Sequence, residues 1–294
     1  PSHMDRVRDF RPAPAAAPPV ARGAWLALAV VLGAAFMSLL DTTIVNVALP
    51  TIRTSLDASE STLSWIISGY ALAFGLALIP AGRLGDRYGH KWVFITGLAL
   101  FPSASLARGP AQTDLQLIIA RVVQGLGGGI FFPAVSAFIQ LLFPPMARGK
   151  AFAILGAVIG VSSALGPLVG GLIIQALGDE TGWRWIFAVN LPIGVIVLVA
   201  AIALLPSEAA GKATSNDLIG LVLLSGALVA LLVPLIQGQE EGWPLWTYLS
   251  IGGGVLLVVL FALWRRNVAS RGKDPLVPPR LHSPMSRSKR TKPR

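Results

Sequence analysis

Asp41 is the first residue of this chain whose chemistry needs an explanation. It stands about two-thirds of the way along the apolar run Trp25–Leu49, in the stretch LLDTTIVNVALP, with Thr42, Thr43 and Asn46 as polar companions. An aspartate at the centre of a membrane-spanning helix costs about 2.5–3.5 kcal/mol. Two interpretations are open: a structural carboxylate held by neighbouring donors, or a titrating group that faces a cavity. We favour the second, because desolvation favours the neutral form of a carboxyl group and can make it a proton carrier.

Arg121 is a second charge within an apolar run, in the stretch IIARVVQGLGGGIFFPA. Gln124 at i+3 and Gly125 at i+4 share its helix face. A guanidinium stays charged in proteins, so at this depth it must face protein or water. It could snorkel to the nearer interface, or line a cavity where it stabilises an ionised carboxylate or polarises water in a proton path. Asp41 is the candidate partner, although the sequence alone does not place the two side chains in contact.

The stretch AGRLGDRYGHK, from Ala81 to Lys91, is expected to be a loop between two apolar runs. Asp86 is placed to accept hydrogen bonds from a helix N-terminus or an arginine. A basic turn that sets membrane topology would explain the positive charges but not the Gly/Asp/Gly spacing. The glycines permit tight turns and the basic side chains can pair with carboxylates or lipid phosphates; these residues are Gly82, Gly85, Gly89, Arg83, Arg87 and Lys91.

A glycine stripe lies in ILGAVIGVSSALGPLVGGLII, where Gly156 and Gly160, and Gly166 and Gly170, are spaced four residues apart. Small residues at this spacing let another helix approach closely. Pro167 removes one backbone donor and should kink the helix. We interpret the stripe as a packing surface, which would also serve function if this interface must move.

Soluble-enzyme chemistry finds no support in the sequence. The chain has no cysteine, and its three histidines, His3, His90 and His282, share no metal-ligand spacing. The Gly127–Gly129 run precedes no phosphate-binding lysine, so a nucleotide loop is not indicated. We therefore expect neither an enzyme nor an ATP-driven pump, and no bound metal or other cofactor.

The composition indicates that membrane-spanning segments position these residues. Of 294 residues, 54% are hydrophobic and 13% are charged, and the mean hydropathy is +0.68. A soluble domain carries about 25% charged residues, so this chain has too little polar surface for a water-soluble globule. The net charge is +10, but most of the excess lies in the tails and the segments flanking apolar runs. Attraction to anionic lipid explains that placement better than nucleic-acid binding, which we reject.

Eight apolar runs are long enough to cross a bilayer, which needs roughly 20 residues per helix. The third is short and carries Pro102. The runs are Trp25–Leu49, Leu63–Ala81, Trp92–Ala107, Leu115–Phe143, Ala151–Leu177, Trp185–Leu205, Leu218–Ile236 and Trp246–Trp264.

Loop charges predict the orientation of these runs. With a cytoplasmic amino terminus, inner segments hold most Lys and Arg, as the positive-inside rule requires, and both ends of the chain are cytoplasmic. The outer loops then hold only Arg53, Arg108 and Arg184, beside seven acidic residues: Asp57, Glu60, Asp114, Asp179, Glu180, Glu240 and Glu241.

The expected fold is an all-α membrane protein with a six-helix bundle followed by two further transmembrane helices. Residues 1–22 are predicted to be a disordered cytoplasmic tail and 23–206 the bundle. An Ala/Gly/Ser-rich linker spans 207–217, the helix pair 218–264, and a basic cytoplasmic tail 265–294.

Five stretches together resemble the major facilitator superfamily. GRLGDRYGHK resembles its signature between the second and third helices, ARVVQGLGGG the fourth-helix signature, and GPLVGG the fifth-helix antiporter signature. LDTTIVNVALPTI and WRWIFAVNLPIG narrow the resemblance to fourteen-helix drug:proton antiporters, over about Trp25 to Leu281. The residues in place are Gly82, Asp86, Arg87, Gly89 and Lys91; Arg121, Gln124 and Gly125; and Gly166, Pro167, Gly170 and Gly171.

The resemblance implies alternating access around a midplane cavity, driven by the proton gradient, with a small hydrophobic or cationic compound as substrate. Asp41, with Asn46, would belong to the proton or substrate path, and Arg121, with Gln124, to proton handling. Asp86 and Arg87 would form a cytoplasmic charge latch, and Gly166 and Pro167 would shape the antiport helix. The implied location is the bacterial inner or plasma membrane; the resemblance leaves the oligomeric state open.

Three departures from the family pattern stand out. His90 occupies a position where arginine is usual, and Gly85 one where alanine is usual. The chain also stops after eight predicted spans, where the family places a second six-helix bundle, and PLVPPRL leads into the basic HSPMSRSKRTKPR. This end is expected to be truncated or frame-altered. Two functions therefore remain: a proton-coupled exporter or a fragment of one, and a non-transporting membrane remnant or interaction module.

Overall fold

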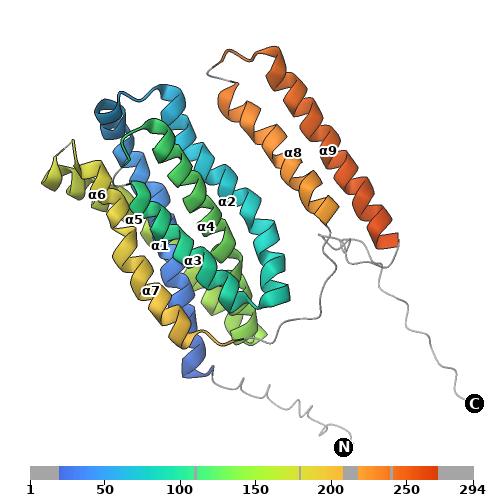
Figure 1. Ribbon diagram of the computed structural model, residues 1–294. Helices are drawn as coiled ribbons and strands as arrows, with labels where there is room; N and C mark the ends of the chain where they lie inside the picture. Colours follow the sequence, from blue (N-terminus) through green and yellow to red (C-terminus); the bar gives the residue numbers. More distant parts are fainter. Residues whose placement is uncertain (1–19, 109–110, 179, 208–217, 239–240, 271–294) are drawn as a thin grey trace, which may run out of the picture.

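The computed structural model describes residues 20–108, 111–178, 180–207, 218–238 and 241–270, and all regular structure in these ranges is helical. The predicted all-α fold is therefore confirmed for that part of the chain (Figure 1). The helices are α1 (Arg22–Leu56), α2 (Glu60–Tyr88), α3 (His90–Arg108), α4 (Asp114–Leu142), α5 (Pro145–Leu177), α6 (Gly182–Ala188), α7 (Asn190–Leu204), α8 (Leu218–Gln237) and α9 (Leu245–Ser270).

Seven helical segments of the described residues are long and apolar enough to cross a membrane. They are α1, α2, α4, α5, α8, α9 and the joined pair α6–α7, over Gly182–Leu204. The predicted third span, α3, falls outside this set, and its 19 residues carry His90, Lys91 and Arg108 at their ends. It nevertheless packs extensively against α4 inside the bundle. The chain is thus a multi-pass membrane protein.

Glycines let α4 pack closely between α2 and α3. A Cβ atom on Gly127 would lie 2.9 Å from the backbone nitrogen of Phe101 on α3, and one on Gly128 would lie 2.9 Å from the Phe74 ring on α2. The Gly127–Gly129 run, for which the sequence did not indicate a nucleotide loop, therefore allows close helix packing. Beside it, edge-to-face contacts join Phe101 to Phe131, and α1 lies across this core with its apolar face buried.

Several predicted boundaries were wrong. The expected loop from Ala81 to Lys91 is helical except at Gly89, because α2 continues to Tyr88 and α3 begins at His90. Gly89 alone makes the turn, with a φ of 92° that a side chain would strain. The predicted sixth span is two helices, α6 and α7, that meet at Val189.

The helices α8 and α9 form a hairpin that stands beside α2, apart from the other helices (Figure 1). Few of their described side chains are buried, as expected for helices whose solvent is lipid. The predicted tails at 1–22 and 265–294 lie largely outside the described residues, and so does the predicted linker 207–217, apart from Ser207. The domain boundaries remain a prediction.

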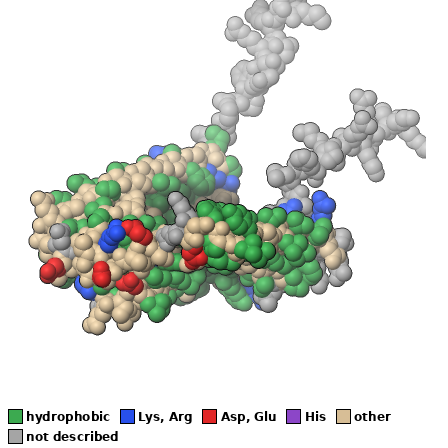
Figure 2. Space-filling view, turned by 90° about the horizontal axis from the view of Figure 1, so that it is seen from above, with side chains coloured by type: hydrophobic (Ala, Val, Ile, Leu, Met, Phe, Trp, Pro, Cys, Tyr) green, Lys and Arg blue, Asp and Glu red, His purple; other side chains and the backbone are tan. Residues whose placement is uncertain are grey.

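Acidic side chains gather at one end of the molecule, which we call the acidic end (Figure 2). It is formed by the end of α1, the first turns of α2 and α4, and the α5–α6 and α8–α9 connections. The described acidic residues there are Asp57, Glu60, Asp114, Glu180 and Glu241.

Candidate functional site: a buried carboxylate between two arginines

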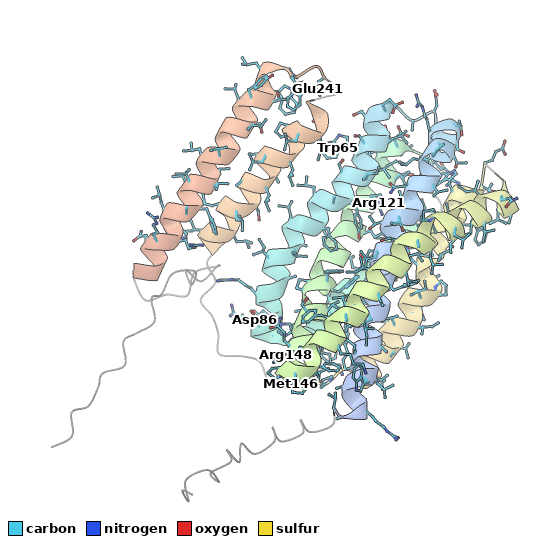
Figure 3. All side chains as sticks on the ribbon, turned by 180° about the vertical axis from the view of Figure 1, so that it is seen from behind. Trp65, Asp86, Arg121, Met146, Arg148 and Glu241 are labelled. Atoms are coloured by element: carbon cyan, nitrogen blue, oxygen red, sulfur yellow. The ribbon has the colours of Figure 1, made fainter. Side chains whose placement is uncertain are left out.

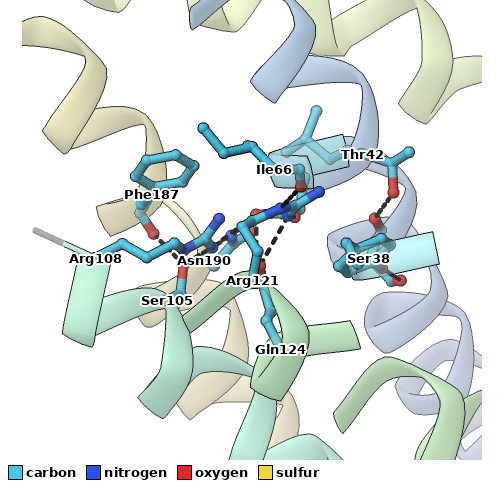
Figure 4. A network of polar contacts seen from close by, with 12 residues as sticks. Ser38, Thr42, Ile66, Ser105, Arg108, Arg121, Gln124, Phe187 and Asn190 are labelled. Atoms are coloured by element: carbon cyan, nitrogen blue, oxygen red, sulfur yellow. Dashed lines mark hydrogen bonds and ion pairs between the residues drawn. The ribbon is translucent and has the colours of Figure 1, made fainter. Parts of the chain in front are cut away.

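A polar cluster inside the bundle brings Arg108, Arg121, Gln124 and Asn190 together (Figure 4), and the acceptor that all four share is Asp41. Its side chain is fully buried, and it accepts hydrogen bonds from three other helices. Oδ2 accepts from Nη1 of Arg121 on α4 at 2.6 Å. Oδ1 accepts from Nε2 of Gln124 at 3.0 Å and from Nδ2 of Asn190, the first residue of α7, at 2.5 Å. Nη2 of Arg108 on α3 lies 3.1 Å from the same oxygen.

The expected pairing of Asp41 with Arg121 is present. Arg121 does not snorkel: only 1% of it is exposed, and its Nε and Nη1 both donate to further acceptors. Nε donates to the Ile66 carbonyl of α2 at 2.9 Å, and Nη1 also donates to Gln124 Oε1 at 2.9 Å. Its guanidinium carbon stands 4.2 Å from the ring centroid of Tyr70. Such a charge is tolerated inside the bundle because its Nε and Nη1 meet acceptors and its guanidinium stands over an aromatic face.

Arg108 was predicted to lie in an outer loop, and that prediction was wrong. It is the last residue of α3, is fully buried and points into the Asp41 cluster. Its Nη2 donates to Ser105 Oγ at 2.7 Å, and its guanidinium lies 3.8 Å from the ring centroid of Phe187. A signal was available: no turn residue separates Arg108 from the apolar run, and Ser105 lies at i−3 on the same helix face.

Asn190 and Ser105 are cluster members that the sequence did not single out. The break between α6 and α7 places Asn190 at a helix start, where its amide reaches both Asp41 and Ser105 Oγ, the latter at 3.1 Å. Ser105 in turn donates to the carbonyl of Phe187 at 2.7 Å. The stretch WRWIFAVNLPIG carries the family resemblance, but nothing in its spacing indicates which residue it would meet.

Asn46 lies outside this cluster. It is exposed and lines a groove of about 360 Å³ between α1, α2 and α4 that is mostly apolar. Thr42 and Tyr70 also line the groove, and Tyr70 hydroxyl lies 3.0 Å from Ser38 Oγ. Arg121 contributes to its wall, so this one residue contacts both the groove and Asp41. Asp41 itself is not among the groove residues, so the expectation of a carboxylate facing a cavity is not met here.

A second charged group lies at the opposite end of the bundle from the acidic end, where Asp86 and Arg148 are found (Figure 3). A groove of about 500 Å³ there is lined by Gly82, Asp86, His90 and Arg148, among others. Asp86 Oδ1 lies 3.4 Å from His90 Nε2.

The neighbouring signature residues Lys91 and Arg87 each contact another residue of the bundle. Lys91 Nζ donates to the Ile202 carbonyl of α7 at 2.9 Å, and the Arg87 guanidinium stands 5.1 Å from the ring centroid of Tyr88. The signature between the second and third helices thus forms the turn between α2 and α3, and its charged side chains surround Gly89.

The glycines of α5 divide between two faces. Gly166 and Gly170 are buried against α1: a Cβ atom on Gly170 would lie 3.0 Å from Ile44. Gly156, Gly160 and Gly171 have no atom that close within the described residues, so only part of the expected packing stripe is used by this chain. At the buried face, Thr43 Oγ1 donates to the carbonyl of Ser162 at 3.3 Å, across the two helices. Pro167 is exposed, on the other side of α5.

Comparison with known proteins decides the family. The model of the Major Facilitator Superfamily matches residues 31–271, which is most of the chain. This chain belongs to the major facilitator superfamily. The resemblance seen in its five signature stretches is thereby confirmed, and the chain is a transporter-family protein rather than an enzyme.

Relatives of this superfamily member are named as antibiotic exporters and resistance proteins. The "Probable actinorhodin transporter" of Streptomyces coelicolor is 40% identical over 263 residues, which cover 90% of this chain and 46% of the relative. The "Puromycin resistance protein pur8" of Streptomyces alboniger is 39% identical over 258 residues, covering 87% of this chain and 49% of the relative. The superfamily chain therefore spans about half the length of the curated relatives it matches.

Solved structures share its fold. The peptide transporter POT in complex with sulfate aligns with a TM-score of 0.57 and 21% identity, covering 85% of this chain and 52% of the transporter. At 21% identity this similarity supports a shared fold and nothing further.

Proposed function

We propose that this chain provides the Asp41-containing bundle of a proton-coupled exporter of small hydrophobic or cationic compounds. The observation that carries the proposal is a buried carboxylate, Asp41, held by guanidiniums inside membrane-spanning helices. Ionisable groups at this depth mark proton or substrate pathways. The names of the relatives, an actinorhodin transporter and a puromycin resistance protein, support a small-molecule substrate.

Substrate would occupy the groove beside Thr42, Asn46 and Tyr70. This groove is largely apolar with a few polar groups, which suits hydrophobic drug-sized compounds. Arg121 connects it to Asp41, so a change in the charge of the cluster reaches the substrate through one side chain. Proton binding at Asp41 would favour one facing of the transporter and substrate binding the other.

The proposed orientation places the acidic end outside and both ends of the chain in the cytoplasm of a bacterial plasma membrane. Basic residues of the described chain support it, since Arg83, Arg87 and Lys91 lie around the α2–α3 turn and Arg148 and Lys150 lie in the first turns of α5, away from the acidic end. The proton gradient would then drive export without a bound cofactor.

Reconstitution of the purified 294-residue chain into vesicles tests the proposal. Dye efflux driven by an imposed proton gradient is expected, and Asp41→Asn and Arg121→Ala should each abolish it while leaving membrane insertion intact. Arg53→Ala is the matched control, because Arg53 is an exposed arginine near the end of α1, paired with Glu60. Efflux at the wild-type rate in both cluster variants would overturn the proposal. A folded chain without any efflux would instead support the non-transporting interaction module.

A further inference from the structure

The Asp41 cluster carries more positive than negative charge. Arg108 and Arg121 face a single carboxylate, and each of the three side chains is at most 1% exposed. One guanidinium would suffice to neutralise Asp41. The second one, Arg108, therefore needs an explanation that the pairing of Asp41 with Arg121 does not give.

The two arginines are held differently. Arg121 bonds a carboxylate, a side-chain amide and a backbone carbonyl. Within the described residues, Arg108 bonds through Nη2 to Asp41 and Ser105, and its buried Nε and Nη1 have no hydrogen-bond partner there. Removing buried donors from water without a partner is unfavourable. Arg108 is thus the less firmly held of the two cations, and it lies at the end of α3 nearest the acidic end.

Other groups around Asp41 do not offset this charge. Among the described elements packed against it, α2 contributes Tyr70, whose hydroxyl is engaged with Ser38, and α6 contributes the Phe187 ring. The α7 residue in contact is the uncharged Asn190. A proton on Asp41 would leave two guanidiniums close together with no counter-charge, and the low dielectric makes that repulsion strong.

We propose that Arg108 is a positioning residue that keeps Asp41 ionised in this conformation, so that proton uptake by Asp41 requires Arg108 to withdraw. This inference rests on the proposed proton coupling and adds the residue that controls it. Withdrawal is open to Arg108 because a long side chain at a helix end can extend toward the membrane surface. The conformation described here is then the deprotonated one, and the movement of Arg108 is the step that admits the proton.

Infrared titration of the purified chain in lipid nanodiscs tests this inference without any transport assay. The signal is the carbonyl band of a protonated carboxylic acid, assigned to Asp41 by its loss in Asp41→Asn. Wild-type protein should show no Asp41 band at neutral pH. Arg108→Gln should raise the proton affinity of Asp41 about tenfold or more, which moves the appearance of the band by about one pH unit upward.

Two further variants separate charge from structure. Arg108→Lys keeps the positive charge and should titrate close to the wild type, whereas a purely structural role would make it resemble Arg108→Gln. Arg53→Gln removes an exposed arginine near the same end and should change nothing. An Asp41 band in the wild type at neutral pH overturns the inference, even if Arg108→Gln fails to fold. An unchanged titration in a folded Arg108→Gln overturns it too. Loss of efflux in the transport assay tests only the proposed function. The infrared titration results can be judged independently of it.

Discussion

Asp41 and Asp86 are two carboxylates with basic partners, and they sit in opposite environments. Asp41 is fully buried among four donors, whereas 66% of the Asp86 side chain is exposed and its His90 partner lies 3.4 Å away. Water solvates Asp86 whatever its partner does, but only protein groups solvate Asp41. The same residue type therefore serves as a structural and electrostatic centre in one place and as an adjustable surface charge in the other.

The largest effect is expected where Asp41 loses its most firmly bonded partner. Arg121→Met removes that partner together with its Nε bond to the Ile66 carbonyl. Breaking a buried ion pair from one side costs about 3–5 kcal/mol, and Arg108, which still faces Asp41, should keep the loss near the lower end of that range. Unfolding measured in detergent or bicelles should show this loss. A loss below about 1 kcal/mol would mean that Asp41 is solvated in some other way and would remove the contrast with Asp86.

An intermediate effect is expected from packing on α5, where one helix offers a matched pair of positions. Gly166→Val adds atoms that meet Thr43, since even its Cβ would lie 2.6 Å from the Thr43 Cβ. Overpacking of this kind costs about 1–3 kcal/mol. Gly160→Val places its side chain where no atom lies within 4 Å and should change stability by less than about 0.5 kcal/mol. Equal losses at the two positions would show that Gly160 is also covered.

The smallest effect is expected at Asp86. Asp86→Asn removes an exposed carboxylate whose pairing contributes at most about 1 kcal/mol. His90→Gln should cost more than Asp86→Asn, because the His90 side chain is only 13% exposed and also contacts the Phe138 ring edge-on. The same unfolding measurement applies. A loss at Asp86 as large as that of Arg121→Met would indicate that Asp86 is buried in the membrane-embedded protein, and the comparison of the two carboxylates would fail.

Much of the bundle could be predicted from the sequence. The lengths of the apolar runs locate the helices. Asp41 and Arg121 can be identified as candidate partners, because a charge inside an apolar run needs a counter-charge. Positions within three or four residues of these charges, such as Gln124, follow from helix geometry. These inferences succeed because each depends on one helix and on the cost of burying charge.

Arg108 and Asn190 could not be placed in the same way. Each depends on where a helix ends or breaks relative to helices far along the chain, and charge counting treats an arginine at a helix end as a loop residue. Asn46 shows the reverse error. It follows Asp41 by five residues, which turns its side chain to another face of α1, so that it lines the groove rather than the cluster.

The single-residue turn at Gly89 joins the end of α2 directly to the start of α3. With α3 only 19 residues long, its far end lies about 27 Å from this pivot. A tilt of about 5° at Gly89 would therefore carry the Arg108 end sideways by about 2 Å, comparable to the difference between a made and a broken hydrogen bond. Small rearrangements among Asp86, Arg87 and Lys91 would thus produce a larger displacement at the other end of α3. That displacement would change the distance between Arg108 and Asp41.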